Sequence, residues 1–216
     1  MDLFEYMSMQ RKKEESPLAV RMRPKNLDEV AGQQHIIGKD KLLYRAIKAD
    51  KISSLIFYGP PGTGKTTLAK VIANTTSANF VQMNATTSGK KDMEQAVSQA
   101  KDAFGMYGKK TILFIDEIHR FNKAQQDYLL PFVEDGTVIL IGATTENPYF
   151  EVNSALLSRS QIFHLEPLAE SDIYRLVKTA VEDNERGMGA YGAVITEEAA
   201  RFIAEMGPAE NARKSL

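Results

Sequence analysis

The chain has 216 residues, of which 43% are hydrophobic and 25% charged, and its formal net charge is −1. This length and composition are typical of a globular protein with one domain, or with one domain and a small second one. The low net charge excludes bulk electrostatic attraction to nucleic acid or an anionic membrane, so DNA contact would need a local basic patch or an assembled ring. The absence of cysteine excludes disulfides and thiolate metal sites.

The N-terminal residues argue against export. The sequence Met1-Asp2-Leu3-Phe4-Glu5 is acidic at once and lacks the basic segment and apolar run of a signal peptide. No apolar stretch approaches the roughly 20 residues that span a bilayer. We therefore expect a soluble, cytoplasmic protein with no membrane partner. Residues 1–20 carry a charged stretch, which we interpret as a solvated leader or, alternatively, as a binding arm.

The middle of the chain alternates between apolar runs of strand length and helical patterns. Strands are predicted at 54–58, 80–83, 111–115, 138–141 and 162–165, and helices at 40–50, 64–76, 90–107 and 123–134. Pro131 should kink or end the last of these helices. Nearly continuous apolar strands that alternate with helices predict an α/β fold whose parallel sheet is covered on both faces.

The pattern changes after Pro167. Residues 169–185 and 196–206 have helical periodicity, and a glycine-rich loop at 186–192 joins them. The predicted organisation is a leader (1–20), an α/β domain (21–167) and a partial helical lid domain (168–216).

A phosphate-binding loop follows the first predicted strand. Its residues match the pattern G-x-x-x-x-G-K-[ST] and are Gly59, Pro60, Pro61, Gly62, Thr63, Gly64, Lys65 and Thr66. Glycines let the backbone N–H groups converge on phosphate oxygens at the start of a helix. We expect ATP here, with Lys65 at the β- and γ-phosphates, Thr66 as a Mg²⁺ ligand and Thr67 also at the nucleotide.

Two carboxylates end the strand predicted at 111–115. Asp116 and Glu117 would lie beside the phosphate loop, because ligands bind at the carboxyl ends of parallel strands. Asp116 is the expected Mg²⁺ ligand. Glu117 is the candidate general base, which would orient and deprotonate the attacking water.

Two further segments supply candidates for nucleotide sensing. A polar side chain after the strand at 138–141 could position water, with Thr145 as the candidate and Thr144 and Asn147 as alternatives. The helix-like segment 153–159 ends in Arg159. That arginine could act on a neighbouring subunit's phosphates, or it could form a surface salt bridge.

The remaining polar residues favour less specific roles. His35, His119 and His164 are scattered without ligand-like spacing, so structural roles are preferred. Lys90 and Lys91 could contact DNA, although a solvated helix start explains them as well.

Seven segments together carry a family resemblance: residues 1–4, 16–19, 21–24, 32–33, 121–127, 142–148 and 153–159. They resemble the AAA+ ATPases, and in particular the family of bacterial replication-associated recombination protein A and the Werner-helicase-interacting protein. The resemblance implies that 21–33 lines the adenine pocket, with Arg23 and Pro24 at the nucleotide.

The same resemblance implies roles for three side chains. Thr145 would be the first sensor, Arg159 a finger supplied in trans, and Arg213 a second sensor reaching the γ-phosphate from the lid. Family members have Gly-Asp before that Ala-Arg, whereas Glu210-Asn211 stands here.

The function implied is Mg²⁺-assisted ATP hydrolysis on forked or single-stranded DNA in replication-fork maintenance, recombination and repair, in the bacterial cytosol near the nucleoid. Full-length members are tetramers, and replication or single-strand-binding proteins are candidate partners. Family members continue beyond the lid, so we expect a truncated chain with impaired tetramer formation.

Several other functions stay open. Within the superfamily these are a clamp-loader subunit and a Holliday-junction motor. The Thr144-Thr145 pair is similar to the sequence of the junction motor. A nucleotide-gated scaffold would not need the base Glu117, and a small-molecule kinase would not need the segments around Thr145 and Arg159.

Overall fold

A computed structural model describes residues 16–207, which divide into two compact units. One unit is the α/β segment Lys25–Pro167. Of the remaining described residues, 16–24 group with 168–207 in a helical unit.

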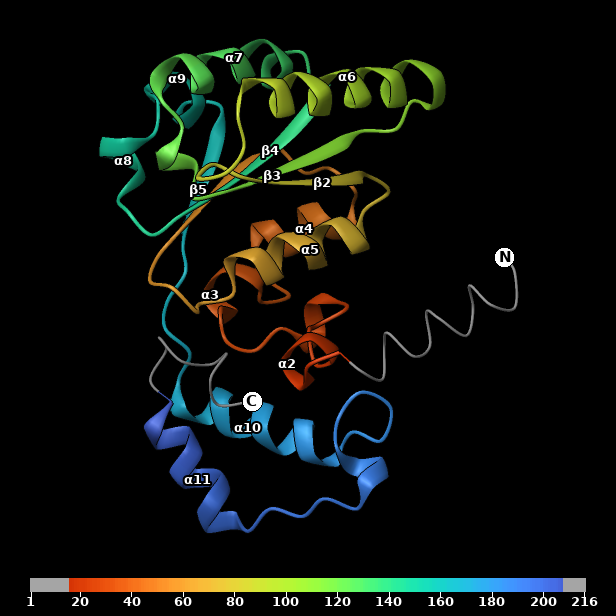
Figure 1. The fold of residues 1–216 in the computed structure, drawn as a ribbon, viewed down its shortest axis with the longest axis vertical. Coiled ribbons are helices and arrows are strands. Elements are labelled where there is room, and N and C mark those ends of the chain that lie inside the picture. Colours follow the sequence, from red (N-terminus) through yellow and green to blue (C-terminus); the bar gives the residue numbers. More distant parts are fainter. Residues whose placement is uncertain (1–15, 208–216) are drawn as a thin grey trace. The chain divides into compact units, whose positions relative to one another are not determined.

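The α/β unit contains a five-stranded sheet in the order β2-β3-β4-β1-β5 (Figure 1). Its strands are β1 (Ser54–Tyr58), β2 (Asn79–Asn84), β3 (Thr111–Asp116), β4 (Val138–Thr144) and β5 (Ser160–His164). Every pairing is parallel, which confirms the expected parallel sheet. Because all strands run the same way, the carboxyl ends of β1, β3 and β4 lie at one edge of the sheet.

The helices of this unit cover both faces of the sheet, with α4 and α5 on one face and α6, α7 and α9 on the other (Figure 1). They are α3 (Gln34–Ile37), α4 (Leu42–Lys48), α5 (Lys65–Thr75), α6 (Lys90–Tyr107), α7 (Lys123–Glu134), α8 (Pro148–Glu151) and α9 (Ser154–Leu157). Two 3-10 turns are also present, η1 (Leu27–Glu29) and η2 (Ile118–Arg120).

Strand β3 shows how the sequence creates two cores. Its side chains alternate between the faces of the sheet, so that Ile112 and Phe114 join one hydrophobic cluster while Leu113 and Ile115 join the other. The first cluster contains residues of α4 and α5, and the second contains residues of α6, α7 and α9. Full burial of one such side chain contributes roughly 1.5–3 kcal/mol. Burial on both faces explains why the strand is an unbroken apolar run.

Helix α7 differs from expectation at its proline. Asn122 caps its N-terminus, and the Asn122 side chain accepts from the Gln125 N–H at 2.9 Å. The Gln125 side-chain oxygen in turn accepts from the Asn122 N–H at 2.9 Å. The helix then continues through Pro131 to Glu134, so the proline does not end it. Leu129, one turn before the end, is fully buried, and this packing offsets the lost backbone hydrogen bond.

The helical unit contains α2 (Leu18–Arg21), α10 (Glu170–Glu182), α11 (Glu197–Met206) and a 3-10 turn, η3 (Gly189–Tyr191). Ile173 and Val177 of α10 pack against Ala200 and Ala204 of α11. In the loop after α10, the Asp183 carboxylate accepts from the N–H groups of residues 185 and 186, which holds the pKa of this carboxyl below its ordinary value. None of the helices within residues 16–207 has the length and hydropathy to cross a membrane.

Candidate nucleotide-binding and catalytic site

The phosphate-binding loop joins β1 to α5. Gly59, Gly62 and Gly64 have φ values of 144°, 81° and 92°, which L side chains rarely adopt. At Gly59 a second constraint applies, because an added Cβ would lie 2.2 Å from the Leu165 carbonyl oxygen. The backbone therefore passes close to the end of β5 at this position, which is why only glycine fits there.

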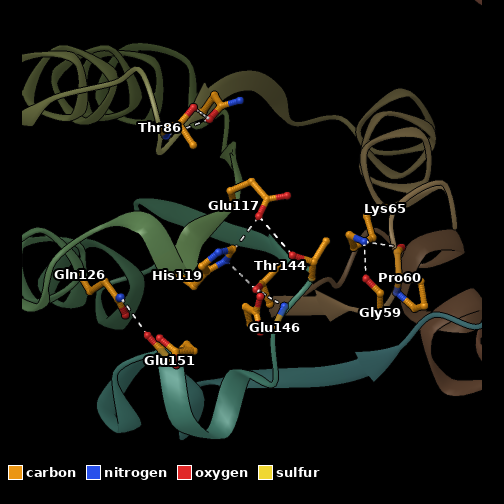
Figure 2. Close-up of polar contacts among 12 residues, drawn as sticks. Gly59, Pro60, Lys65, Thr86, Glu117, His119, Gln126, Thr144, Glu146 and Glu151 are labelled. Carbon is orange, nitrogen blue, oxygen red and sulfur yellow. Dashed lines mark hydrogen bonds and ion pairs between the residues drawn. The ribbon is translucent and has the colours of Figure 1, made fainter. Parts of the chain in front are cut away.

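Lys65, the first residue of α5, bends back over this loop (Figure 2). Its Nζ donates to the carbonyl oxygens of Gly59 at 2.6 Å and Pro60 at 2.8 Å. Burial lowers the pKa of this ammonium below its ordinary value, while the nearby carboxylates of Glu117 and Asp116 oppose that effect. The site thus holds one buried cation close to two anions.

Thr66 and Asp116 meet at the same edge of the sheet. The Thr66 hydroxyl, at the start of α5, donates to the Asp116 carboxylate, at the end of β3, over 3.4 Å. A hydroxyl and a carboxylate suit Mg²⁺, which prefers few protein ligands together with water and phosphate oxygens. Residues 16–207 contain no group of three or more His, Asp or Glu side chains arranged to hold a metal.

Glu117 has a left-handed backbone conformation, with φ 55° and ψ 45°, at the start of the turn η2. For a residue other than glycine this conformation costs of order 1–3 kcal/mol and is concentrated at functional sites. The carboxylate oxygen Oε2 accepts from the Thr145 hydroxyl at 3.5 Å. It also lies 3.5 Å from the His119 Nδ1 (Figure 2). The candidate base is therefore contacted by Thr145, the residue after β4, and by His119 of the turn η2.

The three candidate sensors occupy different environments. Thr144 is fully buried, and its hydroxyl lies 2.8 Å from the His119 Nδ1. Asn147 caps α8 by accepting from the Tyr149 N–H at 3.1 Å. The Thr145 hydroxyl contacts the Glu117 carboxylate at 3.5 Å.

The Gln33 side chain forms hydrogen bonds both to the phosphate loop and to the backbone that follows β5. Its side chain is buried and donates to the carbonyl oxygens of Glu166 at 2.6 Å and Thr63 at 3.3 Å, while its amide oxygen accepts from the Glu166 N–H at 3.1 Å. In the sequence, Gln33 belongs to the segments 32–33 and 21–33 of the family resemblance, and neither of them indicates its burial. A buried polar side chain with three backbone bonds explains the choice of glutamine.

Gln126 is a second buried glutamine, which positions the chain around α8 and α9. Its amide nitrogen donates to the carbonyl oxygens of Phe121 at 3.0 Å and Glu151 at 3.4 Å (Figure 2). Its amide oxygen accepts from the Asn153 N–H at 2.7 Å. The sequence gives no sign of this burial, because Gln126 stands among polar residues at the start of α7.

Arg159 follows α9 and makes contacts within its own subunit. Its guanidinium pairs with the Glu134 carboxylate at 2.5 Å and donates to the Ala155 carbonyl oxygen at 2.8 Å and to the Ser158 hydroxyl at 3.0 Å. The arginine is thus held at the end of α7 by an ion pair, the alternative that the sequence left open.

The other predicted residues lie at several places. Thr67 lies in the first turn of α5, and exposed Lys90 and Lys91 begin α6, where Lys90 pairs with Glu94 at 3.6 Å. Pro61 lies in the loop itself. Arg23 and Pro24 belong to the helical unit. Arg213 lies outside the described residues.

Residues 55–168, just over half of the chain, match the family model described as "ATPase family associated with various cellular activities (AAA)". With its parallel sheet and phosphate loop, the chain belongs to this family.

The resemblance inferred from the sequence motifs is confirmed. The chain is 50% identical over 202 residues to "Replication-associated recombination protein A" of Escherichia coli strain K12, covering 93% of this chain and 45% of that protein. It is 41% identical over 203 residues to "ATPase WRNIP1" of Dictyostelium discoideum, covering 94% and 23% respectively. It thus spans less than half the length of these curated relatives.

Solved structures agree with this assignment. The Thermotoga maritima RuvB Holliday junction branch migration motor superposes with a TM-score of 0.68 at 30% identity. The superposition covers 85% of this chain and 59% of that one. The fold is therefore that of an AAA ATPase.

Proposed function

We propose that this chain is the ATP-hydrolysing part of a cytoplasmic protein that acts on DNA in replication-fork maintenance, recombination and repair. The observation that carries the proposal is the meeting of Lys65, Thr66, Asp116, Glu117 and Thr145 at one edge of the sheet. Family membership and the names of the relatives support the ATPase and DNA parts respectively.

The loop residues bind the triphosphate in this mechanism. Their backbone N–H groups point to the phosphate oxygens at the start of α5, and Lys65 exchanges its bonds to loop carbonyls for bonds to the β- and γ-phosphates. Thr66 and Asp116 would hold Mg²⁺, which neutralises phosphate charge when bound.

Glu117 and Thr145 act on water. Glu117 accepts a proton as the water oxygen attacks the γ-phosphorus, the bond to the β-phosphate oxygen breaks, and ADP and phosphate are formed. Thr145 orients the carboxylate through the contact between its hydroxyl and Oε2. Arg159 of a neighbouring copy stabilises the charge on the transferring phosphoryl group, so the site is complete only in an oligomer.

A branch-migration motor is the second candidate function, favoured by the superposition on the Thermotoga maritima motor. The identity to replication-associated recombination protein A is higher, at 50% against 30%, and supports the first. A nucleotide-gated scaffold is disfavoured because it would not need Glu117 in a strained conformation beside Thr145.

The test is phosphate release per subunit over a wide range of protein concentration, with and without forked DNA. Activity per subunit should rise with concentration, because Arg159 comes from a neighbour. Glu117→Gln should bind ATP normally and lose roughly 10²–10⁴-fold in turnover, the usual contribution of a general base. Full turnover by that variant would remove Glu117 from its role, and ATP binding without turnover by the wild type would favour the scaffold.

A further inference from the structure

His119 lies two residues after Glu117, in the turn η2, and its side chain is 6% exposed. The turn packs closely on β4 because Gly142 has no side chain there: an added Cβ would lie 3.0 Å from the Ile118 Cδ1. Ile118 is itself fully buried. The hydrophobic core thus fixes the turn and, with it, the imidazole ring of His119.

The ring nitrogen Nδ1 has two neighbours. The hydroxyl oxygen of Thr144 lies 2.8 Å away, and the Glu117 Oε2 lies 3.5 Å away (Figure 2). The Thr144 hydroxyl also accepts from the Glu146 N–H at 3.0 Å, which anchors it to the backbone after β4. The ring therefore lies between the end of β4 and the carboxylate of the candidate base.

The Thr144 hydroxyl fits either tautomer of the ring, because it can donate or accept, whereas the Glu117 carboxylate favours one of them. An ionised carboxylate only accepts hydrogen bonds, so a favourable contact with Oε2 requires a proton on Nδ1. A neutral imidazole with that proton can direct it to the Thr144 hydroxyl and, at longer range, to Glu117. With the opposite tautomer, the Nδ1 lone pair would face the carboxylate.

We propose that His119 is a positioning residue for Glu117. It holds Oε2 toward the end of β4, where the Thr145 hydroxyl contacts the same oxygen, and so leaves Oε1 to accept the proton from water. The left-handed backbone of Glu117 sets the direction of the side chain, and His119 sets its rotation. This inference rests on the proposed function, because it assigns a partner to the proposed base.

The first test compares three substitutions at this position in the ATP hydrolysis assay. In His119→Asn, the amide nitrogen can occupy the place of Nδ1 and donate to the Thr144 hydroxyl beside the Glu117 carboxylate, whereas His119→Gln places its amide one bond further out. His119→Ala removes the donor. We expect His119→Ala and His119→Gln to lower kcat about 10- to 100-fold, as when an outer hydrogen-bond partner of a functional group is lost, with ATP affinity changed less than about twofold. His119→Asn should recover most of kcat.

A second test measures the coupling to Glu117. If His119 acts through this carboxylate, His119→Ala should cause no further loss of residual turnover in a Glu117→Gln background. Thr144→Val removes the hydroxyl that anchors the ring, and Thr144→Ser keeps it. The valine variant should therefore lower kcat and the serine variant should not, which also provides a test if His119→Ala fails to fold.

Three results would overturn the inference. The first is full turnover by His119→Ala. The second is loss of ATP affinity and of the urea midpoint in parallel with kcat, without rescue by asparagine, since that pattern indicates a merely structural role. The third is a wild type that binds ATP without hydrolysing it. That result would contradict the proposed function, and the inference would fall with it. Normal wild-type turnover with no effect at position 119 contradicts the inference alone.

Discussion

The hydroxyl oxygen of Thr66 lies 3.4 Å from a carboxylate oxygen of Asp116, although 50 positions separate the two residues in the chain. One side chain begins α5 and the other ends β3, and the strand order brings these ends to the same edge of the sheet. The pair joins the loop that would bind phosphate to the end of β3, where the next residue is the candidate base Glu117.

This pair predicts the magnesium dependence of turnover. Asp116→Asn should raise the Mg²⁺ concentration needed for half-maximal hydrolysis by at least about tenfold, because a neutral amide is a weaker ligand for a hard cation. Thr66→Ala should act in the same direction, whereas Thr66→Ser keeps the hydroxyl and should resemble the wild type. The measurement is phosphate release titrated with Mg²⁺. Unchanged Mg²⁺ dependence in Asp116→Asn would remove both residues from the metal site.

Lys65 predicts a pH dependence of stability. Burial lowers the pKa of the folded-state ammonium below its ordinary value of 10.5, so the unfolded chain binds more protons between the lowered pKa and 10.5. The free energy of unfolding of the wild type should therefore rise relative to that of Lys65→Met as the pH increases through that window. Urea unfolding of both proteins in a pH series measures the difference. A difference that is constant with pH would contradict the burial of the charge.

Arg159 predicts complementation between two inactive variants. Arg159→Ala keeps its own Glu117 but cannot serve a neighbour, and Glu117→Gln keeps Arg159 but lacks the base. A mixture should recover activity, because some interfaces then combine an intact base with an intact arginine. Each variant measured alone at the same total concentration is the control. A mixture no more active than the controls would confine Arg159 to its ion pair with Glu134.

Two glycines with positive φ should respond differently to substitution by alanine: Gly59 in the phosphate loop and Gly136 after α7. Gly59→Ala combines a positive φ with an added Cβ 2.2 Å from the Leu165 carbonyl oxygen, whereas Gly136→Ala has the positive φ in open space. Gly136→Ala should cost about 1 kcal/mol in free energy of unfolding. Gly59→Ala should cost more than that and also weaken ATP binding. Chemical denaturation compares the two, and equal losses would show that strain, not the close approach, dominates at Gly59.

The sequence was most informative where function depends on contiguous residues. The loop at 59–66 and the pair Asp116 and Glu117 follow apolar strands, and the parallel sheet brings these strand ends together as expected. The end of strand β4 was predicted too early. The apolar run indicated an end at residue 141, but the strand continues to Thr144. Gly142 remains in the strand because the Ile56 and Ile118 side chains occupy the space of its missing side chain.

Contacts between distant segments could not be predicted from the sequence. Nothing in the local pattern shows that Glu134 pairs with Arg159, or that a buried Gln33 reaches the backbone of Glu166. For His119, the short spacing after Glu117 was visible, but its contact with Thr144 depends on how η2 packs against β4. Such contacts follow from the tertiary fold, which a single sequence specifies only through all of its residues together.

The sheet order also has a consequence for synthesis of the chain on the ribosome. Strand β1 is the first strand to be made, yet its two neighbours in the sheet are β4 and β5, the last two. Its apolar residues 55–57 can pair only after residues 141–143 and 161–163 have been translated. Pairing at such sequence separation is slow and leaves apolar strand exposed meanwhile. A nascent chain that ends before β5 also lacks Leu165, which lies close to Gly59 in the complete fold. We therefore expect nucleotide to stabilise this domain only after nearly all of it has been synthesised.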